Sequence, residues 1–247
     1  MATEILLQTE GLTKRYKGAA VAALDDLTLH VASGEVYGFL GSNGAGKSTT
    51  IRALLGFLQP TSGSASICGL NIAHNSVTVK QHVGYLAGDI ALYPKVTGQE
   101  LFDYLLKLQQ SSDRDYLNEL IQKFKVDPQQ LIGSLSKGNR QKIGIIQAFM
   151  HKPDVLILDE PTSGLDPLMQ EVFYETVHVA SKRGAAVFVS SHNLAETQRM
   201  CDRIGIIKHG KLIHEQAINT SAVLSKPVFK IVLASPKKRQ NSIIRKL

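Results

Sequence analysis

The sequence predicts an α/β fold with a mainly parallel sheet, an antiparallel β subdomain and an inserted helical subdomain. Three observations support this prediction. Short apolar, β-branched segments alternate with longer segments of helical periodicity, as in parallel sheets whose strands are connected by helices. The segments at 36–40, 155–158 and 186–189 are apolar nearly throughout, as expected for strands covered on both faces. The interval between residues 86 and 155 has helical patterns and no convincing strand.

Each expected strand is a short run of β-branched and aliphatic residues bounded by turn-forming residues. In chain order these strands are Ile5–Gln8, Leu27–Val31, Val36–Leu40, Ser64–Ile67, Val83–Leu86, Val155–Leu158, Ala186–Val189 and Ile204–Ile207. A last hairpin turns at His209-Gly210 into Lys211–His214. Since the first 35 residues and segment 63–75 flank the parallel strands, we expect them to form the antiparallel pieces.

Helices are expected where apolar residues recur every three or four positions. They are Lys47–Phe57, Gly98–Gln109, Asp113–Phe124, Gly138–Met150, Pro167–Ser181 and Asn193–Met200. In the fourth, Ile143, Ile146 and Met150 keep this spacing, and the Lys-Pro pair at 152–153 ends the helix. We therefore expect one domain over residues 1–219, in which a helical subdomain occupies about 88–153.

Composition excludes several classes of protein. The chain has 247 residues, 43% of them hydrophobic, which is enough to bury a core. No apolar run approaches the roughly 18 residues that span a bilayer, and the first residues lack the pattern of a secretory signal, so we expect a cytoplasmic protein. Cys68 and Cys201 stand in unrelated contexts, and we expect reduced structural thiols and neither a disulfide framework nor a zinc site.

The positive charge is concentrated at the carboxyl end. The formal net charge is +7, from 28 basic and 21 acidic residues, and no acidic residue follows Glu215. The seven basic residues beyond that point are Lys226, Lys230, Lys237, Lys238, Arg239, Arg245 and Lys246. The rest of the chain is neutral, which argues against nucleic-acid binding. The basic tail at 220–247 is either a solvated end or a segment that lies near anionic lipid.

A phosphate-binding loop is predicted between the strand at 36–40 and the helix after it. The segment Gly41-Ser42-Asn43-Gly44-Ala45-Gly46-Lys47-Ser48 matches the pattern G-x-x-x-x-G-K-[ST] in letters and in context. Its backbone N–H groups can hold a β-phosphate, Lys47 can reach the β and γ oxygens, and Ser48 can bind Mg²⁺. With Thr49 included, residues 41–49 are the expected nucleotide-binding residues, and the fold is a P-loop NTPase core; the alternative is a glycine-rich turn.

Two adjacent carboxylates follow the apolar strand at 155–158. Asp159 and Glu160 lie where ligands bind at the carboxyl edge of an open sheet. A buried carboxylate without a partner is costly, so the pair indicates a metal ion and a reacting water. We expect Asp159 to orient Mg²⁺ and Glu160 to act as the general base or to position the water. The alternative is a solvated turn with two acids.

With these motifs in order, the chain resembles the nucleotide-binding subunit of ATP-binding cassette (ABC) transporters over about residues 5–215. Leu135-Ser136-Lys137-Gly138-Asn139, followed by Arg140-Gln141-Lys142, resembles the family signature LSGGQRQK. Ser163–Asp166 resembles the loop that crosses the dimer interface, His192 resembles the switch histidine, and Tyr16 falls where the family stacks an aromatic ring on adenine. The resemblance implies that residues 1–219 form an ABC ATPase domain.

The resemblance also implies that the signature contacts the ATP of a second subunit. The residues expected to do so are Leu135, Ser136, Lys137, Gly138, Asn139 and Asp166. Ser136 and the N–H groups after it begin a helix, which is a suitable site for a γ-phosphate. The alternatives are a simple helix cap at Ser136, a structural histidine at His192 and ordinary packing of Tyr16.

Two departures from the family pattern affect the expected chemistry. Lys137 and Asn139 replace a glycine and a glutamine, which leaves the signature either active or altered in hydrolysis. Gly88 stands where the family carries a glutamine that touches Mg²⁺ and the membrane subunit. Neither Gly88 nor Asp89 can reproduce a glutamine amide. We expect Asp89 either to take over part of the metal contact or to face water in a flexible hinge.

The expected function is ATP hydrolysis by a subunit that dimerises around ATP with Mg²⁺ and drives a separate membrane protein from the cytoplasmic side of the membrane. The variant signature resembles the drug and polysaccharide exporter branch, so export is favoured over import. Two alternatives remain. One is a soluble ABC ATPase that acts on DNA or ribosomes, although the chain has one cassette and no long coiled coil. The other is a catalytically weak partner in a heterodimer, which Gly88 and Lys137 suggest.

Overall fold

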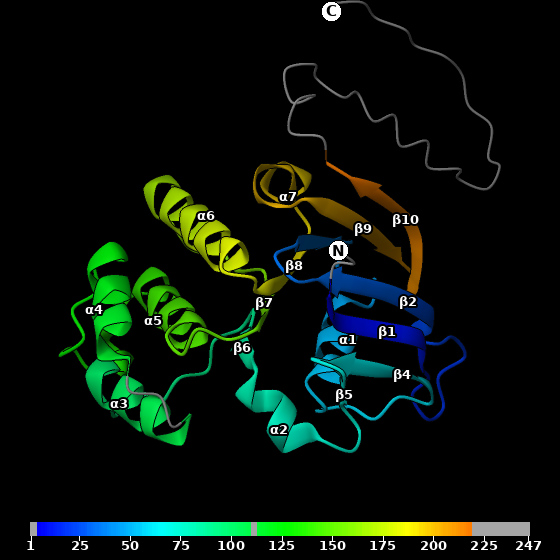
Figure 1. Cartoon of the computed structure of the whole chain (residues 1–247), viewed down its shortest axis with the longest axis horizontal. Coiled ribbons are helices and arrows are strands. Elements are labelled where there is room, and N and C mark those ends of the chain that lie inside the picture. Colours follow the sequence, from blue (N-terminus) through cyan, green and yellow to red (C-terminus); the bar gives the residue numbers. More distant parts are fainter. Residues whose placement is uncertain (1–3, 110–112, 219–247) are drawn as a thin grey trace, which may run out of the picture.

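A computed structural model describes residues 4–109 and 113–218. Its centre is a six-stranded sheet in the order β10-β9-β3-β8-β7-β6 (Figure 1). The bounds of these strands are β3 Val36–Leu40, β6 Val83–Leu86, β7 Val155–Asp159, β8 Ala186–Ser191, β9 Arg203–Lys208 and β10 Lys211–Ala217. Neighbouring strands are parallel except β9 and β10, which form the expected hairpin. The predicted α/β fold with a mainly parallel sheet is confirmed.

The central strands are apolar because both faces of the sheet are covered. Leu156 and Leu158 of β7 belong to one hydrophobic core, which the helical side of the molecule completes. Val155 and Ile157 of the same strand belong to a second core on the opposite face. Successive side chains of a strand point to opposite faces, so a strand covered on both sides is apolar at successive positions, without the alternation of a half-exposed strand.

A second sheet, antiparallel and four-stranded in the order β2-β1-β4-β5, lies beside the first (Figure 1). Its strands are β1 Ile5–Lys14, β2 Leu24–Ala32, β4 Ser62–Ile67 and β5 Leu70–Asn71. It shares the second core with the helix α1 (Lys47–Leu54). Sequence analysis missed β5, because two residues are too few to establish an alternating pattern.

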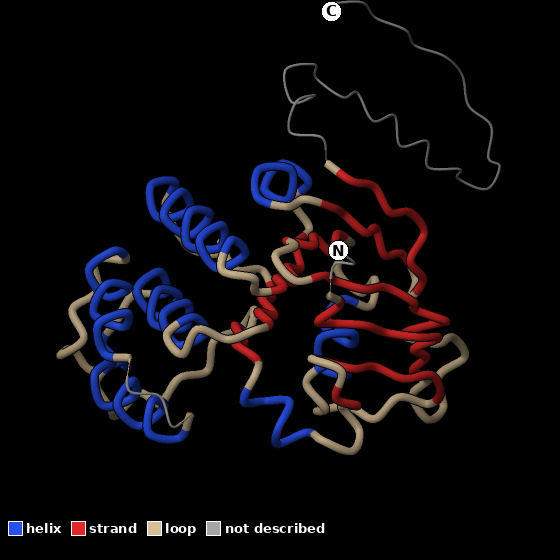
Figure 2. The backbone as a smooth tube through the Cα atoms, in the orientation of Figure 1, coloured by secondary structure: helices blue, strands red, loops and turns tan. Residues whose placement is uncertain are grey.

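The helices between β6 and β7 lie together on the side of the molecule away from the antiparallel sheet, as Figure 2 shows. They are α3 Gly98–Leu108, α4 Arg114–Lys123, η1 Ile132–Ser134 and α5 Lys137–Phe149. Of these, α5 packs against β6. The remaining helices are α2 Ser76–Gln81, α6 Pro167–Lys182 and α7 Leu194–Met200. The sequence did not predict α2, whose Val77, Thr78 and Val79 have low helix propensity, or the single turn η1.

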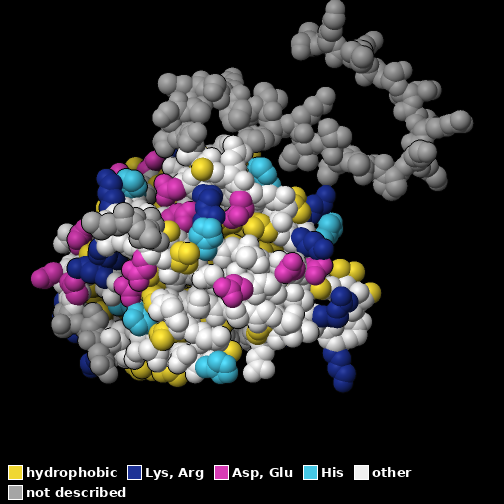
Figure 3. All heavy atoms as spheres, turned by 45° about the vertical axis from the view of Figure 1, so that its right-hand side comes forward, with side chains coloured by type: hydrophobic (Ala, Val, Ile, Leu, Met, Phe, Trp, Pro, Cys, Tyr) yellow, Lys and Arg dark blue, Asp and Glu magenta, His cyan; other side chains and the backbone are white. Residues whose placement is uncertain are grey.

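The division into subdomains at residues 88 and 153 stays a prediction, and the basic tail at 220–247 lies outside the described residues. Acidic and basic side chains are interspersed over the face drawn in Figure 3. Within residues 4–109 and 113–218, no helix is both long and apolar enough to cross a membrane.

Candidate nucleotide-binding site

The phosphate-binding loop connects β3 to α1 at the carboxyl edge of the central sheet. Gly44 and Gly46 have φ of 79° and 118°, in a region that favours glycine. A β-carbon at Gly41 would lie 2.7 Å from Ile207 Cγ2 and 2.8 Å from the Ile207 carbonyl oxygen. These glycines let the loop turn close to β9, so that it leads into the amino end of α1. Its free N–H groups can hold a phosphate there.

Lys47 lies across the mouth of this loop. Its side chain is only 7% exposed, and Nζ donates to the carbonyl oxygen of Gly41 at 2.6 Å. Nζ also lies 3.6 Å from Glu160 Oε1. A buried ammonium held by one carbonyl and one carboxylate can reach phosphate oxygens at the loop.

Asp159 ends β7 at the same edge and is held by the neighbouring strand β8. Ser190 Oγ donates to Asp159 Oδ1 in a short hydrogen bond. Burial raises the pKa of Asp159, the hydrogen bond from Ser190 opposes that rise, and the nearby Glu160 charge adds to it. Ser48 lines the same cavity. A carboxylate and a hydroxyl are hard oxygen donors, so this pair fits Mg²⁺, and a cation there would favour the ionised carboxylate.

Glu160 is oriented by contacts on both carboxylate oxygens. His192 Nδ1 lies 2.8 Å from Oε2, and Lys47 Nζ lies 3.6 Å from Oε1. The backbone of Glu160 has a φ of 46°, which is uncommon for a residue with a side chain, and its N–H donates to the Ser190 carbonyl oxygen at 3.1 Å. A strained backbone held by the next strand is typical of functional positions.

These residues line one cavity of about 530 Å³. Its lining residues are Asn43, Lys47, Ser48, Ile51, Arg52, Tyr85, Ala87, Gly88, Asp89, Asp159, Glu160, Thr162, Ser163, His192 and Glu196. The structure therefore brings the predicted loop, the carboxylate pair, His192 and Asp89 together. Gly41, Ser42, Gly44, Ala45, Gly46 and Thr49 belong to the same loop and helix start but are not among the lining residues.

Six of the lining residues were not predicted from the sequence: Ile51, Arg52, Tyr85, Ala87, Thr162 and Glu196. Glu196 Oε2 accepts from Thr162 Oγ1 at 2.9 Å and from Ser191 Oγ at 3.3 Å. This carboxylate ties the first turn of α7 to the segment after Glu160. No local motif marks it; its only signal is its position four residues after His192.

Gly88 is packed against the proposed metal-binding carboxylate. A β-carbon at residue 88 would lie 3.3 Å from both Cγ and Oδ2 of Asp159. Any side chain at this position would therefore press on Asp159. Asp89 is exposed and lines the cavity, so the structure is compatible with both roles expected for it.

The signature residues begin α5. Ser136 caps this helix, and its Oγ accepts from the Asn139 N–H at 3.2 Å. A β-carbon at Gly138 would lie 2.8 Å from the Gly164 carbonyl oxygen, and the Lys137 side chain passes beside Gly164. The signature and the segment 163–166 therefore lie together, and Leu135 and residues 136–139 are not among the residues that line the cavity.

Two further contacts fix the signature helix and its neighbour. Gln141 is buried, and its Nε2 donates to the Pro161 carbonyl oxygen at 2.7 Å. Asp166 caps α6 by accepting from the Met169 N–H at 2.9 Å. The Gln141 hydrogen bond thus links the segment after Glu160 to α5.

Tyr16 is 43% exposed in the loop after β1. The Lys14 ammonium lies 5.6 Å from the centre of its ring, and Tyr16 is not among the residues that line the cavity. An exposed ring is available for stacking on a base, and the assignment of Tyr16 to adenine stays a prediction.

Comparisons with known proteins show the family to which the chain belongs. The ABC transporter family model matches residues 24–163. The bacitracin transport ATP-binding protein BcrA of Bacillus licheniformis is 37% identical over 213 residues, which cover 85% of this chain and 69% of that protein. NatA of Bacillus subtilis, an ABC transporter ATP-binding protein, is 33% identical over 83% of this chain and 85% of its own length.

Solved structures agree as well. The structure of an ATP-binding subunit of an ABC transporter has a TM-score of 0.82 at 31% identity, over 86% of this chain and 90% of that one. MJ0796, a bacterial ABC transporter cassette solved as a dimer, has a TM-score of 0.79 at 22% identity, over 87% of this chain and 99% of that one, which supports the fold. This chain therefore belongs to the ABC transporter family, as an ATP-binding subunit with ATPase activity.

Proposed function

We propose that this subunit pairs with a second ATPase subunit around two ATP molecules and powers export through a separate transmembrane subunit. The names of two relatives fit the export of drug-like compounds. BcrA is named a bacitracin transport ATP-binding protein. YbhF of Escherichia coli, 35% identical over 85% of this chain and 37% of its own length, is named a probable multidrug ABC transporter ATP-binding protein. On this proposal the subunit is peripheral, on the cytoplasmic side of the membrane. Its basic tail at 220–247 would lie near anionic lipid.

ATP binding is assigned to the loop and its surroundings. The backbone of residues 41–46 and the side chain of Lys47 hold the phosphates, and Thr49 continues the helix that supplies the N–H groups. Ser48 and Asp159 would hold Mg²⁺, with Asp89 as an additional oxygen donor. When bound, Mg²⁺ neutralises charge on the β- and γ-phosphates. Tyr16 is assigned to the adenine ring.

Hydrolysis is assigned to Glu160 and His192. The Glu160 carboxylate accepts a proton from the water that attacks the γ-phosphate, or orients that water in line. His192 contacts Glu160 through Nδ1, so it fixes the direction of the carboxylate. With both ring nitrogens protonated, Nε2–H would also donate to a γ-phosphate oxygen. Lys47 balances the charge of Glu160 before ATP arrives and then contacts the phosphates.

The second half of the site is assigned to another subunit. Residues 135–139 cap α5 away from the cavity of their own chain, so their N–H groups serve a phosphate only if it belongs to a neighbour. Ser136, Lys137 and Asn139 are exposed or half-buried and are free to make that contact. Asp166 lies beyond Gly164 on the same surface.

The observation that carries the proposal is the placement of Glu160, whose two oxygens face Lys47 and His192 inside the cavity. Glu160→Gln keeps the shape and removes the base, so we expect turnover to fall by about 100-fold or more, with ATP binding retained. Lys47→Ala removes the phosphate contact, and we expect it to lose ATP affinity instead. Steady-state ATPase rates and equilibrium ATP binding distinguish the two variants. Parent-level turnover in Glu160→Gln would overturn the assignment.

A second candidate function is that of a catalytically weak partner in a heterodimer. Two residues favour this function. Gly88 lies beside Asp159 and has no side chain to contact a metal ion, and Lys137 adds a charge to the signature. The purified chain alone would then bind ATP with little turnover at any protein concentration. Addition of a second, different ATPase subunit would raise the rate.

A further inference from the structure

A second group of reactive side chains lies at the opposite edge of the central sheet. Cys68, His82 and Asp154 each offer one ligand atom, and these three atoms lie within 4.8 Å of one another. His82 and Asp154 directly precede β6 and β7, whose register pairs Val83 with Val155. They therefore stand at the amino ends of parallel strands, whereas the nucleotide site lies at the carboxyl ends.

The fold brings the three residues together from separate segments. The Val155 N–H donates to the His82 carbonyl oxygen at 3.0 Å, which fixes His82 beside Asp154. Cys68 comes from the turn between β4 and β5 in the antiparallel sheet, where it packs against the second core. This arrangement connects the two sheets, and no spacing in the sequence could reveal it.

Backbone preference does not account for the cysteine at position 68. Cys68 and Gly69 have φ of 50° and 74°, and Ile67 pairs with Leu70 across them, so they form a two-residue turn with both residues left-handed. Such turns favour Asn-Gly or Asp-Gly. A cysteine there costs about 1–2 kcal/mol in backbone energy. This cost indicates that the thiol, and not the turn, is the reason for a cysteine at this position.

We propose that Cys68, His82 and Asp154 form a binding site for a divalent transition-metal ion of the zinc class. Thiolate, imidazole and carboxylate are the three donor types that Zn²⁺ takes. Tetrahedral coordination at Zn–N of about 2.0 Å and Zn–S of about 2.3 Å requires donor separations of roughly 3.3–3.8 Å. The present spread of up to 4.8 Å needs only small side-chain movement to reach this.

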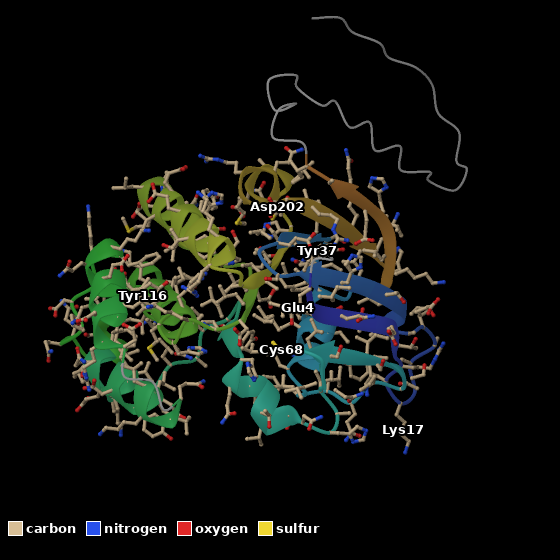
Figure 4. All side chains as sticks on the ribbon, in the orientation of Figure 1. Glu4, Lys17, Tyr37, Cys68, Tyr116 and Asp202 are labelled. Atoms are coloured by element: carbon tan, nitrogen blue, oxygen red, sulfur yellow. The ribbon has the colours of Figure 1, made fainter. Side chains whose placement is uncertain are left out.

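The contact between His82 and Asp154 suits either of two coordination modes. His82 Nδ1 lies 2.7 Å from Asp154 Oδ2, so both can turn to the ion, or Asp154 can hold His82 while Nε2 binds the ion. Their side chains are 37% and 58% exposed, which gives an ion access. They line a cavity of about 520 Å³ together with Cys68 and Glu4, and the basic residues Lys152 and Arg183 also line it. Figure 4 labels Cys68 and Glu4. The remaining position is open to water.

A thiol nucleophile is the competing interpretation of the same three residues. Burial, and after it the nearby carboxylates of Asp154 and Glu4, raise the pKa of the Cys68 thiol to about 11. A metal-free Cys68 is therefore a neutral thiol at pH 7, whereas a nucleophilic cysteine needs a thiolate. A metal cation bound at the site would favour the thiolate form of Cys68.

The proposal predicts that the site joins the antiparallel sheet to the central sheet. An ion that binds the folded chain and not the unfolded chain stabilises it. Thermal unfolding of the nucleotide-free protein should therefore move to higher temperature with Zn²⁺ and remain unchanged with Mg²⁺ at the same concentration.

The test is a titration of the reduced, tag-free full chain with Co²⁺ in the absence of nucleotide, followed by Zn²⁺ competition. A thiolate bound to Co²⁺ gives a near-ultraviolet charge-transfer band, and the nucleotide cavity has no cysteine among its lining residues. We expect one equivalent of Co²⁺ to produce the band and Zn²⁺ to abolish it. Cys68→Ser should remove the band, and His82→Asn and Asp154→Asn should each weaken Zn²⁺ binding by about 10-fold or more.

The controls are a cysteine and a histidine outside the site. Cys201→Ala removes the other free thiol, which is buried, and His74→Asn changes an exposed histidine near α2; both should retain the band. Circular dichroism confirms that each variant is folded. Absence of the band in the parent protein, or its persistence in Cys68→Ser, would overturn the proposal. A Co²⁺-independent reaction of Cys68 with iodoacetamide as fast as that of a free thiolate would support the nucleophile instead.

Discussion

Replacing Ser190 by alanine should weaken the proposed metal site without touching any residue assigned to ATP. Ser190 is fully buried in β8, and its hydroxyl donates to the Asp159 carboxylate. A hydrogen bond to a charged group contributes about 1.5–3 kcal/mol. Water from the adjacent cavity can replace part of it, so we take a loss of about 1.4 kcal/mol, which corresponds to a tenfold change in an equilibrium constant.

Loss of the Ser190 hydrogen bond should also change how the ATPase rate depends on pH. Burial already raises the pKa of Asp159, and the Ser190 hydrogen bond opposes that rise. Without this hydrogen bond, the pKa of Asp159 should rise further. Because the ionised carboxylate is the form that binds a cation, Ser190→Ala should retain activity at high pH. As the pH falls, it should lose activity at a higher pH than the parent protein does. The acid limb of the ATPase profile should therefore move to higher pH.

The assay is the initial ATPase rate as a function of pH and of free Mg²⁺ at saturating ATP. We expect Ser190→Ala to need about tenfold more Mg²⁺ for half-maximal rate near neutral pH. Ser191→Ala is the matched control, because the Ser191 hydroxyl contacts Glu196 and the Asn193 N–H and makes no hydrogen bond with Asp159. If both Ser190→Ala curves superimposed on the parent curves, the assignment of Asp159 to the metal would be refuted.

Two further changes test neighbouring features. Asp89→Ala should raise the Mg²⁺ concentration for half-maximal ATPase while ATP affinity without metal stays nearly unchanged, and a titration that coincides with the parent would place Asp89 outside the metal site. Gln141→Leu leaves the Pro161 carbonyl oxygen without its buried partner, so the free energy of unfolding in urea should fall by about 1–3 kcal/mol. The control is Gln122→Leu at an exposed position of α4. Equal stability of the two variants would argue against the Gln141 contact.

The sequence predicted those parts of the fold that local patterns determine. Residues 155–158 of β7 are apolar throughout because both faces of the strand are buried, and such a run can be recognised in the sequence. The loop at 41–48 was predictable because close approach to Ile207 and the left-handed turns require glycine. The short elements β5 and α2 were missed, since tertiary contacts and not propensity determine them.

The parts of the site that depend on distant contacts could not be predicted. Glu196 reaches the cavity through hydrogen bonds to Thr162 and Ser191, and nothing around it in the sequence indicates a role. Cys68 appeared isolated because its neighbours His82 and Asp154 are far away in the chain. Side chains that meet through strand register leave no spacing pattern.

The most direct test of the account is whether ATP assembles two subunits through the signature. Glu160→Gln should bind ATP without turning it over and, with ATP present, sediment as a dimer that holds one ATP per subunit. Glu160→Gln combined with Ser136→Arg should bind ATP and remain monomeric, because the large side chain blocks the N–H groups at the start of α5. Analytical ultracentrifugation with and without ATP measures both. A Glu160→Gln chain that stays monomeric with ATP bound, or a dimer that persists in the double variant, would contradict a site shared between subunits.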